Sequence, residues 1–530
     1  MKGNCTVFLK SRIAKGFREI FIKSEKEKNT PGRALKPLPI IIFLFCVWIF
    51  LKIILEFPYS STDVFIFKDP GANLIFKHGF FAENLPYTSG EKIVHFMQGY
   101  LYSLLYGLYT LVVGFGFRKA IFFDSMIDLL RFIFTYVYLT YLIYAIKKIR
   151  TVLPFFLLLP IFFTFFDSDR SDILATCLAL ANFILIAKTE RNYKKNLILT
   201  ALLTSLCLFT APAIGFFTLL ISWLFLWSIS RRLKICFTYL SIFAICSLLQ
   251  IGIYFLFFSK SLILLMDCYK RWYRSGGGNV TSFLWHYWRF SFNATSISRI
   301  IHIFLWIQIG ITLIAYKSSR RLSTQSDNLR LTNTFFMGTL TCILLSYLFF
   351  PWQYNYLIFL SYLLIIYSII IFTLLPKIRA RMLLLVLLSL NFLLPAGISA
   401  KVFIEALLRP KSQSSHFVAQ KIYNIVPFGE KIATIPTYYY ILKKHYDPAD
   451  MNYLSKDTLL SYPYILTGGC GIGKPGVAYI PFQYGSERAL LNDFEVIFDS
   501  LNRSATYVFN LRITRSGYGF GGLLLKRKDY

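Results

Sequence analysis

The sequence predicts a polytopic α-helical membrane protein with about eleven spans and a small C-terminal α/β domain on the extracytoplasmic side. Only 16% of the 530 residues are charged and 56% are hydrophobic, whereas soluble proteins carry roughly a quarter of charged residues. The hydrophobic residues are segregated into blocks that approach the ~20 residues of a membrane-crossing helix. Lysine and arginine gather in short clusters between these blocks, which is the pattern that orients membrane helices.

The net charge of +31 would suggest a nucleic-acid partner in a soluble protein. Here the basic residues lie between apolar blocks, so they act as topology signals and require no polyanion. We therefore expect a membrane partner and no nucleic acid. Of the nine cysteines, six fall inside apolar blocks, where cysteine behaves as a small hydrophobic residue. No CxxC or Cys/His cluster has metal-ligand spacing.

Six basic clusters fix the orientation when all are placed in the cytoplasm. They are the N-terminal segment 1–37 and residues 147–150, 188–195, 231–234, 317–321 and 377–381. The predicted spans are 38–56, 121–146, 152–166, 171–187, 196–212, 214–229, 235–258, 300–316, 331–350, 357–375 and 382–398. Their number is odd, so we expect a multi-pass protein of the plasma (inner) membrane with a cytoplasmic N-terminus and an extracytoplasmic C-terminal domain.

The transmembrane domain, residues 38–398, carries two long outer loops, 57–120 and 259–299. Residues 96–116 are apolar enough to span, but a crossing there would turn every later basic cluster outward. We therefore expect them to form juxtamembrane or re-entrant helices that lie against the bundle. The tail, 399–530, is predicted as a small α/β domain with a helix at 412–426 and strands at 431–435, 464–467, 477–481 and 506–513.

Two aspartates follow the first predicted span, in the segment from Ser60 to Asp69. A carboxylate held among aromatic residues at the membrane surface is partly desolvated, which raises its basicity and suits a general base for an acceptor hydroxyl. Asp63 is our candidate for this base. Either aspartate also fits a helix N-cap, and for Asp69 the cap is favoured because Pro70 follows at the first helical position.

The turn at 167–172 places three carboxylates and Arg170 within six residues, on the same predicted side as the first loop. Asp169 could simply cap the following helix, and acidic turns are common on protein surfaces. Alternatively, the turn binds a cation or orients an acceptor, with Asp172 at the top of its span and directed towards the mouth of the bundle. The sequence leaves both interpretations open.

The loop at 259–299 interleaves six basic residues with tyrosine and tryptophan, and Ser275-Gly276-Gly277-Gly278 gives it a hinge. Such a loop is also typical of an interfacial anchor, with an aromatic belt and snorkelling cations. So many cations on the less positive side favour binding of a phosphate group instead. The candidate phosphate ligands are Lys270, Arg271, Arg274 and Arg289.

Residues 468–474 match the first positions of a phosphate-binding P-loop. However, Pro475 stands where a serine or threonine would bind magnesium, and residues 477–481 look extended, so no helix N-terminus meets a phosphate. We interpret this segment as a glycine-rich turn.

Three short motifs follow one another along the chain. They are Asp63 to Asp69 with Gly79 and Pro86-Tyr87 after it, the element Asp169-Arg170-Ser171-Asp172, and the turn Pro351-Trp352-Gln353-Tyr354. Their order resembles the GT-C superfamily of membrane glycosyltransferases, which includes protein O-mannosyltransferases and lipid A aminoarabinose transferases. The sequence departs from the family in two places, since Val64 follows Asp63 where many members have a second acidic residue, and no His-Pro-Pro motif is present.

The resemblance implies an inverting transferase that moves a sugar from a polyprenyl-phosphate donor to a hydroxyl of a lipid, glycan or protein acceptor at the outer face. It implies that Asp63 is the general base and that Asp172 is a second catalytic residue, with donor phosphate bound by the 259–299 loop. Contacts with the acceptor or sugar are implied for Asp69, Asp169, Gln353 and Tyr354. No cofactor is implied with certainty, although a divalent cation could take part and the metal is unknown.

Two other functions fit parts of the sequence. An O-antigen-type glycan polymerase or ligase would need no acidic first loop and would use basic residues of the large outer loop. These would be Arg271, Arg274, His286 and Arg289. A lipid or solute transporter or flippase would need ionisable residues deep in the membrane. Only Asp124, Asp128 and Arg131 qualify, and an intramembrane ion pair explains them equally well.

Overall fold

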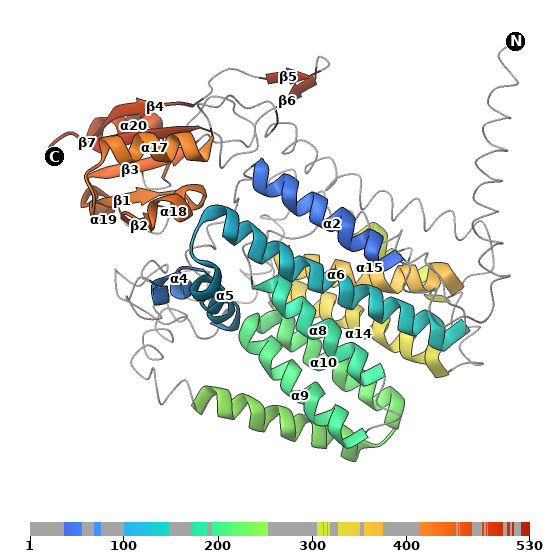
Figure 1. Cartoon of the computed structure of the whole chain (residues 1–530). Helices are drawn as coiled ribbons and strands as arrows, with labels where there is room; N and C mark the ends of the chain where they lie inside the picture. Colours follow the sequence, from blue (N-terminus) through green and yellow to red (C-terminus); the bar gives the residue numbers. More distant parts are fainter. Residues whose placement is uncertain are drawn as a thin grey trace, which may run out of the picture.

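In a computed structural model, the described residues of the chain form a bundle of apolar helices and a unit built on a small mixed β-sheet (Figure 1). The structure describes residues 37–55, 68–75, 100–147, 171–187, 193–252, 305–310, 312–314, 316–317, 327–349, 354–374, 407, 414–451, 454, 456–468, 480–481, 484, 486–501, 506–508, 511–513 and 521–530. The bundle contains α2 (Pro37–Ile54), α6 (Phe117–Lys147), α8 (Asp172–Ala187), α9 (Tyr193–Thr210), α10 (Pro212–Ser230), a helix at Leu233–Gly252, α14 (Asp327–Phe349) and α15 (Tyr354–Leu374).

Each of these helices lies on a segment that the sequence predicts as a span. Such segments form helices because the polar backbone must satisfy its own hydrogen bonds in lipid. In the described part of the chain, three helices are long and apolar enough to cross a membrane. They are Phe117–Ile143, Pro212–Ser230 and Leu233–Gly252. Shorter apolar stretches lie in α2, α8, α9 and α14. The predicted spans 152–166 and 382–398 lie outside the described residues. A mostly helical protein with candidate membrane spans is therefore established, and the number of crossings stays a prediction.

The helix that follows α10 has one polar seam and a broad apolar surface. Its seam faces α9, where the Tyr239 and Thr204 hydroxyls lie 2.9 Å apart and the Ser247 and Ser205 hydroxyls lie 3.0 Å apart. On the outside, 66% of Leu248 is exposed. Hydroxyl side chains that bond between helices, with aliphatic side chains on the outside, are typical of helices packed in lipid.

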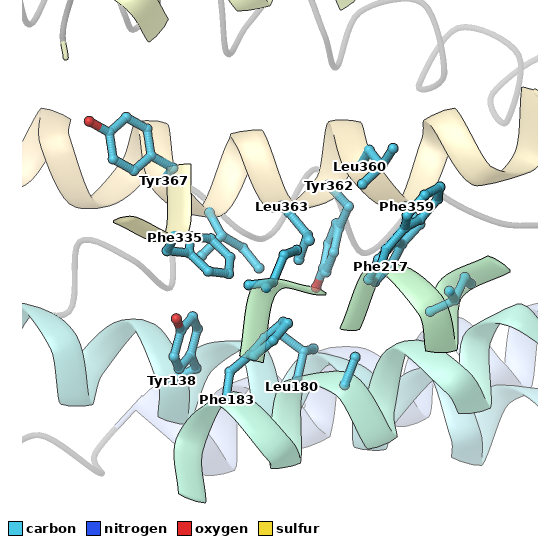
Figure 2. Packing of buried hydrophobic residues seen from close by; sticks show 14 of the residues in the cluster. Tyr138, Leu180, Phe183, Phe217, Phe335, Phe359, Leu360, Tyr362, Leu363 and Tyr367 are labelled. Atoms are coloured by element: carbon cyan, nitrogen blue, oxygen red, sulfur yellow. The ribbon is translucent and has the colours of Figure 1, made fainter. Parts of the chain in front are cut away.

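Aromatic side chains from several helices meet in the centre of the bundle (Figure 2). The Phe335 ring of α14 lies 5.8 Å from Tyr138 of α6 and 5.4 Å from Phe183 of α8, both edge to face. On the same helix, Phe336 stacks on Tyr367 of α15 at 4.4 Å. Such ring pairs are worth about 0.5–1.5 kcal/mol each beyond their buried area. This core holds α6, α8, α14 and α15 in a fixed register.

Two short helices, α4 (Asp69–Ile75) and α5 (Tyr100–Val113), lie at one end of the bundle (Figure 1). With 14 residues, α5 is about 21 Å long, less than the ~30 Å of a bilayer core. It packs closely on α4, since a Cβ added at Gly71 would lie only 2.3 Å from the Ser103 carbonyl oxygen. Whether residues 96–116 cross the membrane stays a prediction, since α8, with 16 residues, is hardly longer than α5.

A turn of three residues joins α5 to α6, and its Gly114 has a φ of +88° that favours glycine. Lys119 of α6 reaches back and donates to the Val113 carbonyl at 2.5 Å. A cation at a helix C-terminus satisfies free carbonyl groups and complements the helix dipole. Lys119, a basic residue on the predicted outer side, thus has a local structural role.

The C-terminal unit, 414–530, is built on a five-stranded sheet of order β2-β1-β3-β7-β4. Its strands are β1 (Lys431–Thr434), β2 (Asp447–Asp450), β3 (Tyr464–Gly468), β4 (Phe494–Asp499) and β7 (Gly522–Arg527). Strands β2, β1 and β3 are parallel, whereas β7 is antiparallel to β3 and to β4. A separate hairpin pairs β5 (Thr506–Val508) with β6 (Leu511–Ile513). The helices of the unit are α17 (Ser415–Ile425), α18 (Pro436–Leu442), α19 (Lys456–Leu460) and α20 (Glu487–Asp493).

Several predicted elements of the tail are found and others differ. The predicted helix 412–426 corresponds to α17, which Ser414 caps by accepting from the Phe417 amide at 3.2 Å. The strands predicted at 431–435 and 464–467 are β1 and β3. The single strand predicted at 506–513 is two strands of a hairpin, and 477–481 lies largely outside the described residues.

Candidate functional site

One buried cluster joins the membrane helices to the C-terminal unit, and we call it the junction. Its core consists of Ala72, Tyr102, Tyr106, Phe117, Ala120, Ile121, Phe123, Ile127, Ile173, Leu174, Cys177, Tyr439 and Tyr440. These residues come from α4, α5, the first half of α6, the start of α8, and α18. Figure 1 shows these elements gathered at one end of the bundle.

Asp69 lies in the junction, with only 1% of the residue exposed. Its Oδ1 atom accepts a hydrogen bond from the Tyr439 hydroxyl and lies 3.1 Å from Lys443 Nζ. Its Oδ2 atom accepts from Asn73 Nδ2 at 3.1 Å. Tyr439 and Lys443 belong to the C-terminal unit, 370 positions or more along the chain. The N-cap predicted for Asp69 is not found, because α4 begins at Asp69 itself, one residue before Pro70. Its carboxylate binds side chains, two of them in the distant α18 region.

Lys68, the preceding residue, is fully buried and forms an ion pair with Asp124 of α6. The Tyr102 hydroxyl of α5 donates to the other oxygen of this carboxylate at 2.5 Å. The Lys68 ammonium group also lies 5.6 Å from the ring centres of both Tyr106 and Tyr440. A cation between aromatic faces gains cation–π attraction, which is stronger when water is excluded.

Two buried ion pairs lie at the junction, Lys68 with Asp124 and Lys443 with Asp69. Taking charges out of water is unfavourable, and the mutual attraction compensates only when the geometry is good. Removing one partner of a buried pair typically costs about 3–5 kcal/mol, because the other charge is then left alone. The presence of these pairs is therefore weak evidence for net stability, whereas the loss of one partner is expected to be strongly destabilising.

Aromatic rings close the junction around these pairs. The Phe115 ring lies 6.3 Å from Tyr439 and 5.9 Å from Tyr440, and Phe117 lies 6.1 Å from Tyr440. Rings at these distances attract and exclude water from the neighbouring charges. The C-terminal unit is thus docked through α18 by both apolar and charged contacts.

Asp172 is placed at the same end of the bundle as the first residue of α8. It is buried, and the next two residues, Ile173 and Leu174, belong to the junction core. A carboxylate in the first turn of a helix is favoured by the helix dipole. Its position fits both the helix-start role and the functional role that the sequence leaves open.

Asp128 and Arg131 of α6 form an ion pair inside the bundle. Arg131 Nη2 lies 2.8 Å from Asp128 Oδ1, one helical turn away. The guanidinium group lies 5.5 Å from the ring centre of Tyr362, whose hydroxyl bonds with Thr135. The sequence offers two interpretations of these residues, a transport role and an intramembrane ion pair. The structure contains the ion pair.

Tyr354 is the first residue of α15, and that helix runs in the same direction as α6. Tyr362 meets Thr135, and five residues later Tyr367 lies at the level of the aromatic core that contains Tyr138. The start of α15 is therefore directed towards the junction end of the bundle. The remaining predicted site residues lie outside the described ranges, namely Asp63, Asp169, Lys270, Arg271, Arg274, Arg289 and Gln353.

Within the residues that can be placed, no three His, Cys, Asp or Glu side chains come close enough together to hold a metal ion. A bound divalent cation therefore stays a prediction. No protein family and no curated protein matches this chain.

The sequence reasoning missed Lys68, Tyr439 and Lys443. A signal was present, because Pro436-Thr437-Tyr438-Tyr439-Tyr440 and Lys443 put an aromatic ring and a cation one helical turn apart. Residues four apart share a helix face, so a helix here places Tyr439 and Lys443 on one surface, but their spacing does not identify the partner.

Proposed function

We propose that this chain is a membrane glycosyltransferase with a GT-C-like fold of about eleven spans. It would transfer a sugar from a polyprenyl-phosphate donor to a hydroxyl of a lipid, glycan or protein acceptor at the outer face of the plasma (inner) membrane. Asp63 is the general base in this proposal. The observation that carries it is the junction, where the first loop, the start of α8 and the C-terminal unit meet.

The proposal needs both acidic elements at one end of the bundle. Asp63 precedes Lys68 by five residues in the sequence, and Asp169 precedes Asp172 by three. Lys68 and Asp172 both lie at the junction end of the bundle, and these short separations along the chain support a shared site.

The contact between α4 and α18 also supports the proposed topology. Side chains that touch cannot be on opposite sides of a hydrocarbon layer ~30 Å thick. The contact of Asp69 with Tyr439 and Lys443 therefore supports a topology in which the first loop and the C-terminal unit share one side, as an odd number of spans after a cytoplasmic N-terminus predicts. In the proposal that side is outside the cytoplasm, by the positive-inside rule.

In the proposed reaction, the Asp63 carboxylate takes the proton of the acceptor hydroxyl while the acceptor oxygen attacks the anomeric carbon. The bond between that carbon and the phosphate oxygen breaks, and the polyprenyl phosphate leaves with the electron pair. Attack from the opposite face inverts the configuration. The basic residues of 259–299 would stabilise the leaving phosphate, and Asp172 would orient the acceptor or a cation.

The proposal is tested by comparing surface glycans and lipids by mass spectrometry with and without the gene. Loss of the gene should remove one glycan modification, and wild-type protein should restore it. Asp63→Asn should fail to restore it at equal expression, whereas Asp457→Asn, on the exposed first turn of α19, should restore it fully. Full restoration by Asp63→Asn would show that the base is wrongly assigned.

A further inference from the structure

Helix α18 and its C-cap residue take part in both buried ion pairs of the junction. The C-cap, Lys443, has its Nζ atom 3.1 Å from Asp69 Oδ1. Tyr440, on the helix itself, has its ring centre 5.6 Å from the Lys68 ammonium group, which is paired with Asp124 of α6. The C-terminal unit therefore contacts two consecutive side chains, Lys68 and Asp69.

The site of the Lys68 ammonium group combines side chains of three helices. Tyr106 of α5 has its ring centre at 5.6 Å from this group, and Tyr102 of α5 donates to the Asp124 carboxylate at 2.5 Å. Aromatic rings stabilise a cation more strongly when water is excluded. Because Tyr440 of α18 supplies one of these rings, the site is complete only while α18 is docked.

The start of α4 connects the two ion pairs through the backbone. The helix begins at Asp69, and the peptide bond fixes the Cα atoms of Lys68 and Asp69 ~3.8 Å apart. If α18 moved away, Asp69 would lose Lys443, and Lys68 would lose the ring of Tyr440. If Lys68 instead left Asp124, the start of α4 would move and would draw Asp69 away from Lys443. Loss of either contact thus weakens the other.

We propose that the two ion pairs form one cooperative latch, which holds α4 between the membrane helices and the C-terminal unit. In this latch, Lys68 and Asp69 are either both bound or both released. Two independent contacts would instead fail one at a time, and each failure would leave α4 held by the other body. The latch acts on the assembly of the protein and does not depend on the proposed reaction.

The latch is tested by hydrogen–deuterium exchange of the α4 amides, residues 69–75, in full-length protein in lipid nanodiscs. Lys68→Met and Lys443→Met should each speed this exchange on the order of 100-fold, because each leaves a buried carboxylate without its cation. The double variant should exchange no faster than the faster single variant, since α4 is already released. If the two increases multiply in the double variant, or if either single variant exchanges like wild type, the latch is wrong.

A matched control is the neighbouring lysine. Lys444 is exposed, whereas Lys443 is buried, so Lys444→Met makes the same chemical change away from the ion pair. Exchange of α4 in Lys444→Met should equal that of wild type. Exchange of the β3 amides, residues 464–468, should be the same in all these proteins, because the Tyr438 hydroxyl and buried Leu442 still hold α18 in its own unit.

A milder comparison tests the shared ring and leaves every charge paired. Tyr440→Phe keeps an aromatic ring next to Lys68, whereas Tyr440→Leu removes it. Tyr440→Leu should speed the exchange of α4 about tenfold, and Tyr440→Phe should speed it far less. Equal exchange in the two variants would show that this ring does not couple α18 to Lys68, and it would overturn the latch. This comparison also decides the question if a charge variant does not fold.

Discussion

Lys68 and Asp69 are neighbours in the chain, yet their side chains bind different parts of the molecule. Lys68 pairs with Asp124 in the bundle, and Asp69 pairs with Lys443 in the C-terminal unit. Because the two residues carry opposite charges, each finds its partner without competing with the other. This alternation of charge connects three bodies, the bundle, the first loop and the C-terminal unit, at one buried point.

Replacing Lys68 by methionine should destabilise the protein strongly, because Asp124 would be left charged and buried. The expected loss is about 3–5 kcal/mol. Lys456→Met is the control, since Lys456 is 53% exposed and its nitrogen lies 3.8 Å from Asp493. That variant should lose less than about 1 kcal/mol. The measurement is the unfolding temperature of purified protein in detergent, and equal shifts for the two variants would contradict the prediction.

The same pair gives a second comparison. Lys68→Met combined with Asp124→Leu leaves no lone buried charge, so the double variant should be more stable than Lys68→Met alone. If the double variant is instead the least stable of the series, the two side chains contribute independently and the ion pair is not the reason for the loss.

Replacing Gly71 by alanine should separate α4 from α5. The new Cβ would lie 2.3 Å from the Ser103 oxygen and 2.8 Å from the Gly107 nitrogen, both backbone atoms that cannot move aside. Overpacking of this kind costs about 1–3 kcal/mol. Gly310→Ala is the control, because its Cβ would meet nothing within 4 Å. The unfolding temperature should fall for Gly71→Ala and should not fall for Gly310→Ala.

Stability at alkaline pH should depend on Tyr423 of α17. Burial, with a smaller contribution from Tyr446, raises the pKa of Tyr423 from 10.0 to about 12. Since the folded pKa is raised, the unfolded chain ionises first. The stabilising contribution is therefore complete below pH 10 and is lost as the pH rises through about 12.

The check is the unfolding temperature of wild type and Tyr423→Phe across that window. Wild type should lose more stability than Tyr423→Phe between pH 10 and pH 12, because phenylalanine does not titrate. Parallel pH dependence in the two proteins would show that Tyr423 titrates with an ordinary pKa.

Reporter fusions test the sidedness on which the proposed site depends. A reporter at the N-terminus should be cytoplasmic and one after Tyr530, which is exposed, should be outside. A cysteine introduced at the exposed Lys456 should react with a membrane-impermeant reagent added from outside. Labelling only after the membrane is broken would place the C-terminal unit in the cytoplasm and remove the basis of the proposed reaction.

Prediction from the sequence worked where a local pattern carries the information. Long apolar blocks bounded by basic residues mark the bundle helices, and Ser414 marks the start of α17. Short elements of the C-terminal unit were missed, such as β2, which contains Pro448 and forms the edge of the sheet, and β7, which pairs with β3 and β4. A strand of four to six residues has little stability alone and is stabilised by pairing with its neighbours in the sheet. Its own residues therefore carry little signal.

By itself, the sequence determined that this is a mostly helical protein with apolar, membrane-type helices and a small folded tail, because burial in lipid depends on composition and on the length of each block. Only the tertiary structure decided which charges meet. Asp69 and Lys443 are hundreds of residues apart, and no local pattern encodes a contact of that range. Their pairing follows from the packing of α18 on α4, where two charges removed from water must be matched.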